Sequence, residues 1–179
     1  MSIHLETPRL QIVTFSGEHL TERYVGWLND PEVVRFSEQR HRRHTLVDCQ
    51  RFWESFENSP NLFLAIVSKD PAAGHIGNLT VYVDPANQIA DIGILIGERA
   101  VWGQGVGLEA WKAVCHYLLD TRAIRKVTAG TLSVNEGMLS IMRRSGMVED
   151  GRRGRHYLCE GQEVDMVHFA LFRSSLKGN

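Results

Sequence analysis

The sequence predicts an α+β domain in which about seven strands form a sheet and about four helices flank it. Three observations lead to this prediction. Short apolar or alternating runs recur between turn residues, as is typical of strands. Longer segments carry apolar residues at helical spacing. No linker or low-complexity segment divides residues 1–179, a length that suits one domain with a substantial core.

The expected strands are runs bounded by glycine, proline, asparagine or aspartate. They lie at 9–15, 62–67, 75–83, 92–96, 125–132 and, as two strands joined by a turn near Glu160-Gly161, within 147–172. The expected helices lie at about 17–29, 45–58, from a glycine-rich loop to about 120, and from Asn135 to about Gly146. Thr45 with Asp48 predicts an N-cap, and Gly146 followed by Met147 predicts a left-handed helix end.

Composition and charge exclude several classes of protein. The net charge of −1 gives no basic field that would recruit nucleic acid. No apolar run approaches the ~20 residues of a membrane span. The N-terminus lacks the apolar region of a signal peptide, and three widely spaced cysteines (Cys49, Cys115 and Cys159) indicate free thiols rather than a disulfide framework. We therefore expect a cytoplasmic protein. The pairs His41-x-x-His44 and His156-x-x-Cys159 lack a second ligand pair, so we expect no metal site.

One stretch, Trp102-Gly-Gln-Gly-Val-Gly-Leu-Glu-Ala110, joins an apolar strand to a helix. A glycine-rich loop at a helix N-terminus offers free N–H groups and a favourable dipole to an anion. A P-loop and a dinucleotide-binding loop both require a glycine where Leu108 stands, so neither spacing fits. The stretch therefore predicts a phosphate-bearing ligand of another kind.

This glycine spacing closely resembles the acetyl-CoA pyrophosphate loop of the GNAT N-acetyltransferase superfamily. Its Trp-Gly-x-Gly-x-Gly-x-Glu-Ala form resembles the RimJ/RimL branch, as does the segment Trp27–Val33. The resemblance covers most of the chain and is strongest from His75 to Gly146. It implies the GNAT fold, with a central mixed, mostly antiparallel twisted sheet. It also implies an acetyl-CoA co-substrate bound by Ile94, Leu95, Ile96, Trp102, Gly103, Gln104, Gly105, Val106, Gly107, Leu108 and Asn135.

An acetyltransferase that acts on an amine needs a base, because an alkylammonium of pKa ~10.4 is almost wholly protonated at neutral pH. The resemblance makes Asp91 the leading base candidate, ahead of Glu98 on the following turn. His75 opens a strand beside the expected site and is a further catalytic candidate, although a hydrogen-bonded structural role is open to it as well. The family's usual acid, a tyrosine seven residues after the asparagine, is replaced here by Met142. Ser133, Ser140 and Tyr157 are weak substitutes.

The acceptor remains open between two kinds of amine. The branch allows a protein N-terminal α-amine, whereas the arginine-rich loop Arg40–His44 would suit the diphosphate of a nucleotide-linked amino sugar. The cluster Gly151–His156 could bind phosphate or an acidic protein, and a solvated surface is open to both clusters. We favour the small molecule. A non-catalytic acyl-CoA-binding module is the alternative from another class, and a homodimer remains possible as the assembly.

Overall fold

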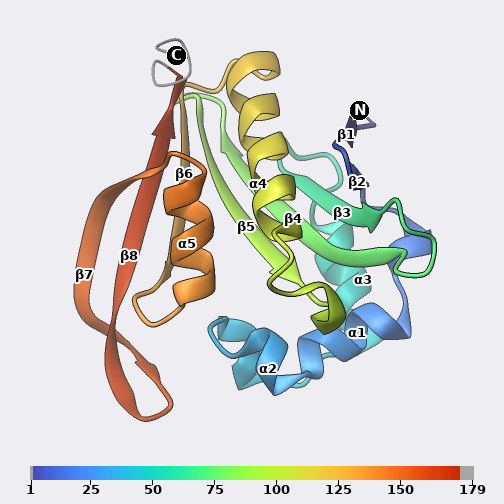
Figure 1. Ribbon diagram of the computed structural model, residues 1–179, viewed down its shortest axis with the longest axis horizontal. Coiled ribbons are helices and arrows are strands. Elements are labelled where there is room, and N and C mark those ends of the chain that lie inside the picture. Colours follow the sequence, from blue (N-terminus) through green and yellow to red (C-terminus); the bar gives the residue numbers. More distant parts are fainter. Residues whose placement is uncertain (1, 174–179) are drawn as a thin grey trace.

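The computed structural model describes residues 2–173, and within them one eight-stranded sheet packs against five α-helices (Figure 1). The strands are β1 (His4–Glu6), β2 (Leu10–Thr14), β3 (Leu62–Ser68), β4 (His75–Asp84), β5 (Ile89–Ile96), β6 (Lys126–Leu132), β7 (Val148–Cys159) and β8 (Gln162–Phe172). The helices are α1 (Glu22–Asn29), α2 (Pro31–Val34), α3 (Leu46–Glu54), α4 (Val106–His116) and α5 (Glu136–Arg144). The α+β prediction is confirmed. The additional strand β1 has three residues, too few for a periodic pattern, and the additional helix α2 lies within residues 31–36, where the sequence indicates a short turn or helix.

The sheet separates two groups of helices. Its order is β1-β2-β3-β4-β5-β6-β8-β7, and β5 with β6 is the parallel pair. Apolar side chains of β5 and β6 form one core with α4 and α5, including Ile92, Trp111 and Leu139. The opposite face of β3 packs against α1 and α3 through Phe63, Tyr24 and other aromatic residues. On β5, Ile94 and Ile96 accordingly pack on the α4 side of the sheet and Leu95 packs on the α1 side.

The parallel pair β5–β6 separates along its length. Pairing is limited to Ile89–Asp91 of β5 against Lys126–Thr128 of β6. Beyond Asp91 the two strands diverge, and the helices that follow them, α4 and α5, both begin at the divergent end (Figure 1). The edge of β5 from Ile92 to Ile96 thus has no strand partner on the β6 side among the described residues. We call the space between this edge and β6 the slot.

A contact across the slot joins α2 to the β7–β8 hairpin. Arg35 holds Glu160 through two hydrogen bonds of 2.7 and 3.0 Å, and Arg40 Nη2 donates to the Leu158 carbonyl at 3.0 Å. Phe36 packs beside a small apolar cluster at the same end of the hairpin. These contacts tie together two parts of the chain that lie on opposite sides of the slot.

Local predictions were confirmed at several turns. Thr45 and Asp48 form a complete capping box, and Gly146 has a φ of 87° with Met147 N–H bonded to the Met142 carbonyl. The predicted helix at 17–29 is instead a 3₁₀ turn at Gly17–His19 followed by α1, whose N-cap is Thr21. The predicted loop after Ser37 contains a 3₁₀ turn at Glu38–His41. Short turns of this kind leave no periodic signature.

Candidate active site

The glycine-rich loop owes its shape to two glycines and its packing to a third. Gly103 and Gly105 have φ values of 74° and 79°, a region that side chains disfavour. Gly105 is the N-cap of α4. Gly107 lies against α5 and β5, since a Cβ there would stand 3.1 Å from Ile141 Cδ1 and 3.5 Å from Ile96 Cγ1. The spacing thus combines two left-handed positions with one close approach.

The N-terminus of α4 can accept an anion. It has no side-chain cap, and the N–H groups of the first turn find no hydrogen-bond partner in residues 2–173. Trp102 is half exposed and donates its indole N–H to the Ile96 carbonyl at 2.9 Å, while Gln104 donates its side-chain amide to Ala100. Trp102 therefore fixes the loop to the end of β5, and Gln104 fixes it to the 3₁₀ turn at Arg99–Val101.

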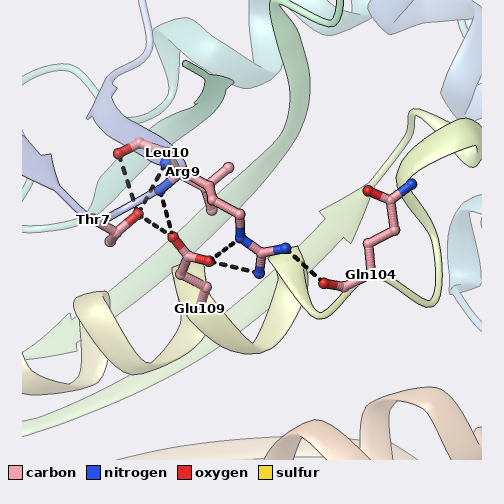
Figure 2. Close-up of polar contacts among 5 residues, drawn as sticks. All are labelled: Thr7, Arg9, Leu10, Gln104 and Glu109. Carbon is pink, nitrogen blue, oxygen red and sulfur yellow. Dashed lines mark hydrogen bonds and ion pairs between the residues drawn. The ribbon is translucent and has the colours of Figure 1, made fainter. Parts of the chain in front are cut away.

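A carboxylate in the first turn of α4 holds the start of the helix and the loop to the connection between β1 and β2 (Figure 2). Glu109 accepts from Thr7 Oγ1 at 2.6 Å, from the Arg9 N–H at 2.9 Å and from Arg9 Nε at 2.7 Å. Arg9 in turn donates from Nη1 to the Gln104 carbonyl at 2.8 Å. Burial alone would raise the pKa of Glu109, but these bonds outweigh it and hold the pKa below its usual value. Sequence reasoning missed this network, because Thr7 and Arg9 lie about a hundred residues from Glu109.

The other predicted cofactor residues lie around the slot. Ile94 and Ile96 point their side chains into the α4 core, whereas Leu95 faces the α1 side, so the backbone of this segment is what the slot exposes. Asn135 is the N-cap of α5, accepts from Met138 N–H at 3.2 Å and donates to Thr131 Oγ1 at 3.0 Å. Its capping role is therefore established by geometry.

A pocket of about 350 Å³ lies on the face of the sheet opposite α4. Its floor contains Phe63, Asn78 and Thr80, and it reaches the slot at Gly93, Ile94 and Leu95. Its walls come from α1, α3 and the segment between α2 and α3: Tyr24, Leu28, Ser37, Gln39, Arg42, His44, Asp48, Cys49 and Phe52, with Tyr82 from β4. The pocket thus adjoins the unpaired edge of β5 from the side that the glycine loop does not occupy.

Asp91 lies where β5 and β6 are last paired. Its Oδ1 accepts from Thr128 Oγ1 at 2.7 Å, and its strand partner on β4 is the pocket residue Tyr82. The carboxylate keeps solvent access, but partial burial between the neighbouring strands raises its pKa. The hydrogen bond from Thr128 and the charge of His168 oppose this shift in part. Asp91 is beside the pocket rather than in its lining, on the same face of β5 as Gly93.

His75 stands apart from Asp91. The two occupy opposite ends of the β4–β5 ladder, about 20 Å apart at ~3.3 Å per residue. The His75 ring packs edge-on against His19 and Trp27, with ring centroids 5.1 and 5.0 Å away. Its Nε2 lies 3.0 Å from the Gly77 carbonyl and 2.9 Å from Asn78 Oδ1. The structure gives His75 contacts with its own strand and an aromatic cluster, and it does not bring His75 together with Asp91.

His75 should make stability depend on pH. Burial lowers its pKa from the ordinary 6.5 to about 4. Between these values the unfolded chain binds a proton that the folded chain does not, so stability falls as the pH drops from about 6.5 to 4 and is unaffected above that range. At ~1.36 kcal/mol per pKa unit the loss is about 3 kcal/mol. We expect urea unfolding to show it, and His75→Gln to flatten the profile relative to His4→Gln, an exposed control. Equal slopes would contradict the prediction.

The usual acid is absent from its position. Met142 is fully buried in the core shared with α4 and cannot donate a proton. Ser140 is exposed on α5, and Ser133 Oγ accepts from Asp165 N–H at 3.2 Å. Tyr157 packs with the cluster at the end of the hairpin. None of these serines or this tyrosine lines the pocket.

Several members of the basic clusters form ion pairs or structural hydrogen bonds. Arg40 bonds to Ser37 and Leu158 and lies 2.9 Å from Glu38, and Arg152 pairs with Glu149 and Asp165. Arg42 differs, since it is exposed, lines the pocket and has no carboxylate within 4.0 Å among residues 2–173. One arginine of the predicted phosphate-binding loop is therefore available to a ligand in this pocket.

Within residues 2–173, no group of three or more histidine, cysteine, aspartate or glutamate side chains converges as a metal ion would require. No helix in this part of the chain is long and apolar enough to cross a membrane.

Residues 9–148 match the model of the acetyltransferase (GNAT) domain family. Among solved structures, the chain is similar to the ribosomal L7/L12 alpha-N-protein acetyltransferase RimL in complex with CoA, with a TM-score of 0.83 and 13% identity over 95% of this chain and 98% of that one. It is also similar to a spermidine N-acetyltransferase from Vibrio cholerae in complex with CoA and spermine, with a TM-score of 0.81 and 13% identity over 94% and 98% of the two chains. A third similar structure is the microcin C7 self-immunity acetyltransferase MccE in complex with acetyl-CoA and AMP, with a TM-score of 0.78 and 17% identity over 93% of each chain.

Proposed function

Because this chain belongs to the GNAT acetyltransferase family, we propose that it transfers the acetyl group of acetyl-CoA to the primary amine of a small molecule, such as a nucleotide-linked amino sugar. The observation that supports this most directly is the position of the pocket. It reaches the unpaired edge of β5 from one face, while the glycine loop and α4 approach the same edge from the other. A donor and an acceptor held on the two faces would meet at the slot.

The residues fit an acetyl-CoA molecule bound along this path. The free N–H groups of the α4 N-terminus would hold the pyrophosphate, and the backbone of Ile94–Ile96 would pair with the pantetheine arm as an added strand does. Trp102, Gly103, Gln104, Gly105, Val106, Gly107 and Leu108 would surround the phosphates, with Asn135 on the far side of the slot. Backbone N–H groups of β5 that face the slot would stabilise negative charge on the thioester oxygen.

Asp91 would take the proton of the acceptor ammonium. Its raised pKa makes it a better base than an ordinary aspartate, and its face of β5 is the one on which the pocket lies. With Met142 in place of an acid, the departing thiolate would leave unprotonated, which its pKa of ~8.5 permits, and the proton that the nitrogen loses after attack would pass to water. His75 would contribute indirectly, since its contacts are with Gly77 and Asn78 rather than with the acceptor.

The pocket's lining favours a small molecule of mixed character. Phe52 and Tyr82 line the pocket and are 37% and 46% exposed, so a planar base could stack on them, and the exposed Arg42 lines the same pocket. Asn78 and Phe63, both 4% exposed, lie at its floor. A nucleotide-linked amino sugar has a base, phosphates and a hydroxylated ring bearing the amine, and this lining offers aromatic, cationic and amide groups to them.

A panel of amines tests the proposal. We expect acetyl-CoA-dependent thiol release with a nucleoside diphosphate amino sugar, with spermidine and a peptide carrying a free N-terminus as the alternative acceptors. Mass spectrometry of the product would identify the acetylated amine. Release with the peptide and not the sugar would favour a protein N-terminal acetyltransferase. Binding of CoA without release in any case would favour a non-catalytic module.

We further propose that the chain belongs to the RimJ/RimL-like branch and that residues 1–179 act as one acetyltransferase domain, of which 1 and 174–179 lie outside the described residues. The form of the glycine loop and the segment Trp27–Val33 support the branch. The segment continues into the α2 contact with the β7–β8 hairpin, which encloses the pocket side of the slot.

Glu109 provides a test of the loop that does not depend on the acceptor. Glu109→Gln keeps the shape of the side chain but removes the charge that Arg9 and Thr7 share, so the Gln104 carbonyl loses its fixed position. We expect the KM for acetyl-CoA to rise by about tenfold, the effect of ~1.4 kcal/mol, with kcat at saturation retained. Steady-state kinetics measure it. Glu6→Gln, which removes an exposed pair with Lys69, is the control. An unchanged KM in Glu109→Gln would show that the network is not needed for binding.

A further inference from the structure

Asn78 is a buried polar residue with one unused donor. Its side chain is 4% exposed and lines the pocket from β4, opposite Leu95 of β5. Its Nδ2 finds no hydrogen-bond partner in residues 2–173. A buried donor left unpaired is costly, and most such groups in proteins are satisfied by protein, water or ligand. Among the described residues that line the pocket, Asn78 has the one such unpaired side-chain atom.

The neighbouring histidine fixes which end of the amide is free. His75 Nε2 contacts the Gly77 carbonyl, which can only accept, so Nε2 must carry the proton. The same N–H then donates to Asn78 at 2.9 Å, and the atom that receives it must be Oδ1. Burial keeps the pKa of His75 near 4, so the ring is neutral and this arrangement holds at neutral pH. The nitrogen of the amide is therefore the atom left without a partner.

The chemistry of a donor limits what it can bind here. The reacting amine must keep its lone pair for the thioester, so a hydrogen bond from Asn78 to that lone pair would oppose the reaction. An oxygen on the acceptor would satisfy Nδ2 without this conflict. We propose that Asn78, held in position by His75, recognises a hydroxyl or carbonyl oxygen next to the reactive amine of the acceptor. This inference rests on the proposed function and narrows its substrate class to amines with a neighbouring oxygen.

A matched pair of amines tests the inference. The probes are trans-2-aminocyclohexanol and cyclohexylamine, which differ by one hydroxyl beside the amine, compared at equal free-amine concentration with saturating acetyl-CoA. We expect the wild type to prefer the amino alcohol in kcat/KM by about tenfold, the effect of one hydrogen bond. In Asn78→Leu the ratio should fall to about one, because leucine offers no donor there. The KM for acetyl-CoA should not change.

Controls separate recognition from a general change in the pocket. Thr80→Val removes a hydroxyl from the same floor and should keep the ratio. His75→Gln retains a donor for Asn78 Oδ1 and should preserve most of the preference, whereas His75→Phe should lose it. Melting temperature and CoA binding check that each variant is folded. A positioning role for His75 predicts this difference between Gln and Phe, and a merely structural role does not.

The outcomes distinguish this inference from the function on which it rests. Thiol release from both probes with a ratio near one, or an unchanged ratio in Asn78→Leu, would overturn the inference and leave the function intact. Side-chain amide NMR gives a readout without turnover. The Asn78 signal, assigned by its loss in Asn78→Asp, should shift when the amino alcohol is added to the CoA complex and not when cyclohexylamine is added. No shift with the amino alcohol would also overturn the inference. Failure of the function would appear separately, as no release with any amine of the panel.

Discussion

Asp91→Asn should lower kcat by about 10²–10⁴-fold while leaving the affinity for acetyl-CoA unchanged. The amide cannot accept the acceptor's proton, yet it keeps the size of the side chain and can still accept from Thr128 Oγ1. Single-turnover kinetics with a competent acceptor would measure the chemical step, and calorimetry would measure CoA binding. Activity equal to that of the wild type would exclude Asp91 as the base.

The pH profile should identify the same group. A base must be unprotonated, so kcat/KM should fall as the pH drops through the pKa of Asp91, which burial places above the ordinary 3.8. This acid limb should vanish in Asp91→Asn. The hydrogen bond from Thr128 lowers the pKa of Asp91, so Thr128→Val should move the limb to higher pH while retaining activity on the plateau. If Thr128→Val left the pH of the acid limb unchanged, the limb would report the titration of another group.

Gly105→Val should abolish binding of CoA. The φ of 79° at this N-cap is a conformation that a β-branched residue avoids, so the loop would have to change its backbone path. The N–H groups at the start of α4 would then no longer point to a common anion site. We expect calorimetry to detect no CoA binding at concentrations that saturate the wild type.

Gly74→Val is the matched control for this second prediction. Gly74 has a φ of 59° and nothing within 4 Å of its missing Cβ, so it carries comparable backbone strain in the turn before β4. It should lose stability and keep CoA affinity. Retained affinity in Gly105→Val would show that the pyrophosphate is bound elsewhere, and equal loss in both variants would assign the effect to stability rather than to the loop.

The sequence was most informative where local rules decide the structure. The glycine spacing, the Thr45–Asp48 box and the Glu160-Gly161 turn each depend on residues close in the chain, and the structure confirmed the strand, loop and helix around them. The divergence of β5 and β6 could not be predicted from the sequence, because backbone pairing between strands about forty residues apart has no side-chain signature. The Glu109 network and the unpaired Asn78 amide were missed for the same reason. Each depends on contacts between residues that a periodic pattern does not connect.

The aromatic cluster around His75 illustrates the limit for catalytic residues. A histidine at a strand end predicts a polar group near the site, and the residue does lie on the strand that lines the pocket. Its direction was set by packing against Phe15, His19 and Trp27, three residues from other segments. The sequence could thus locate the strand that carries His75. It could not identify the side chains against which the ring packs, and these side chains determine whether the ring reaches a substrate.

The contact between α2 and the β7–β8 hairpin has a consequence for how two substrates meet. Trp27 of α1 packs on Gly97 at the end of β5, and Arg35 binds Glu160, so the chain runs around the slot from β5 to the hairpin and returns through β6 to the paired residues at Asp91. The slot is therefore bounded by protein on all sides, and it is not a cleft that is open at one end. The pantetheine arm would lie along the unpaired edge of β5, reached from the α4 side, and the amine would come from the pocket on the other side. Neither would occupy the other's surface, so both could be bound when the acetyl group passes between them.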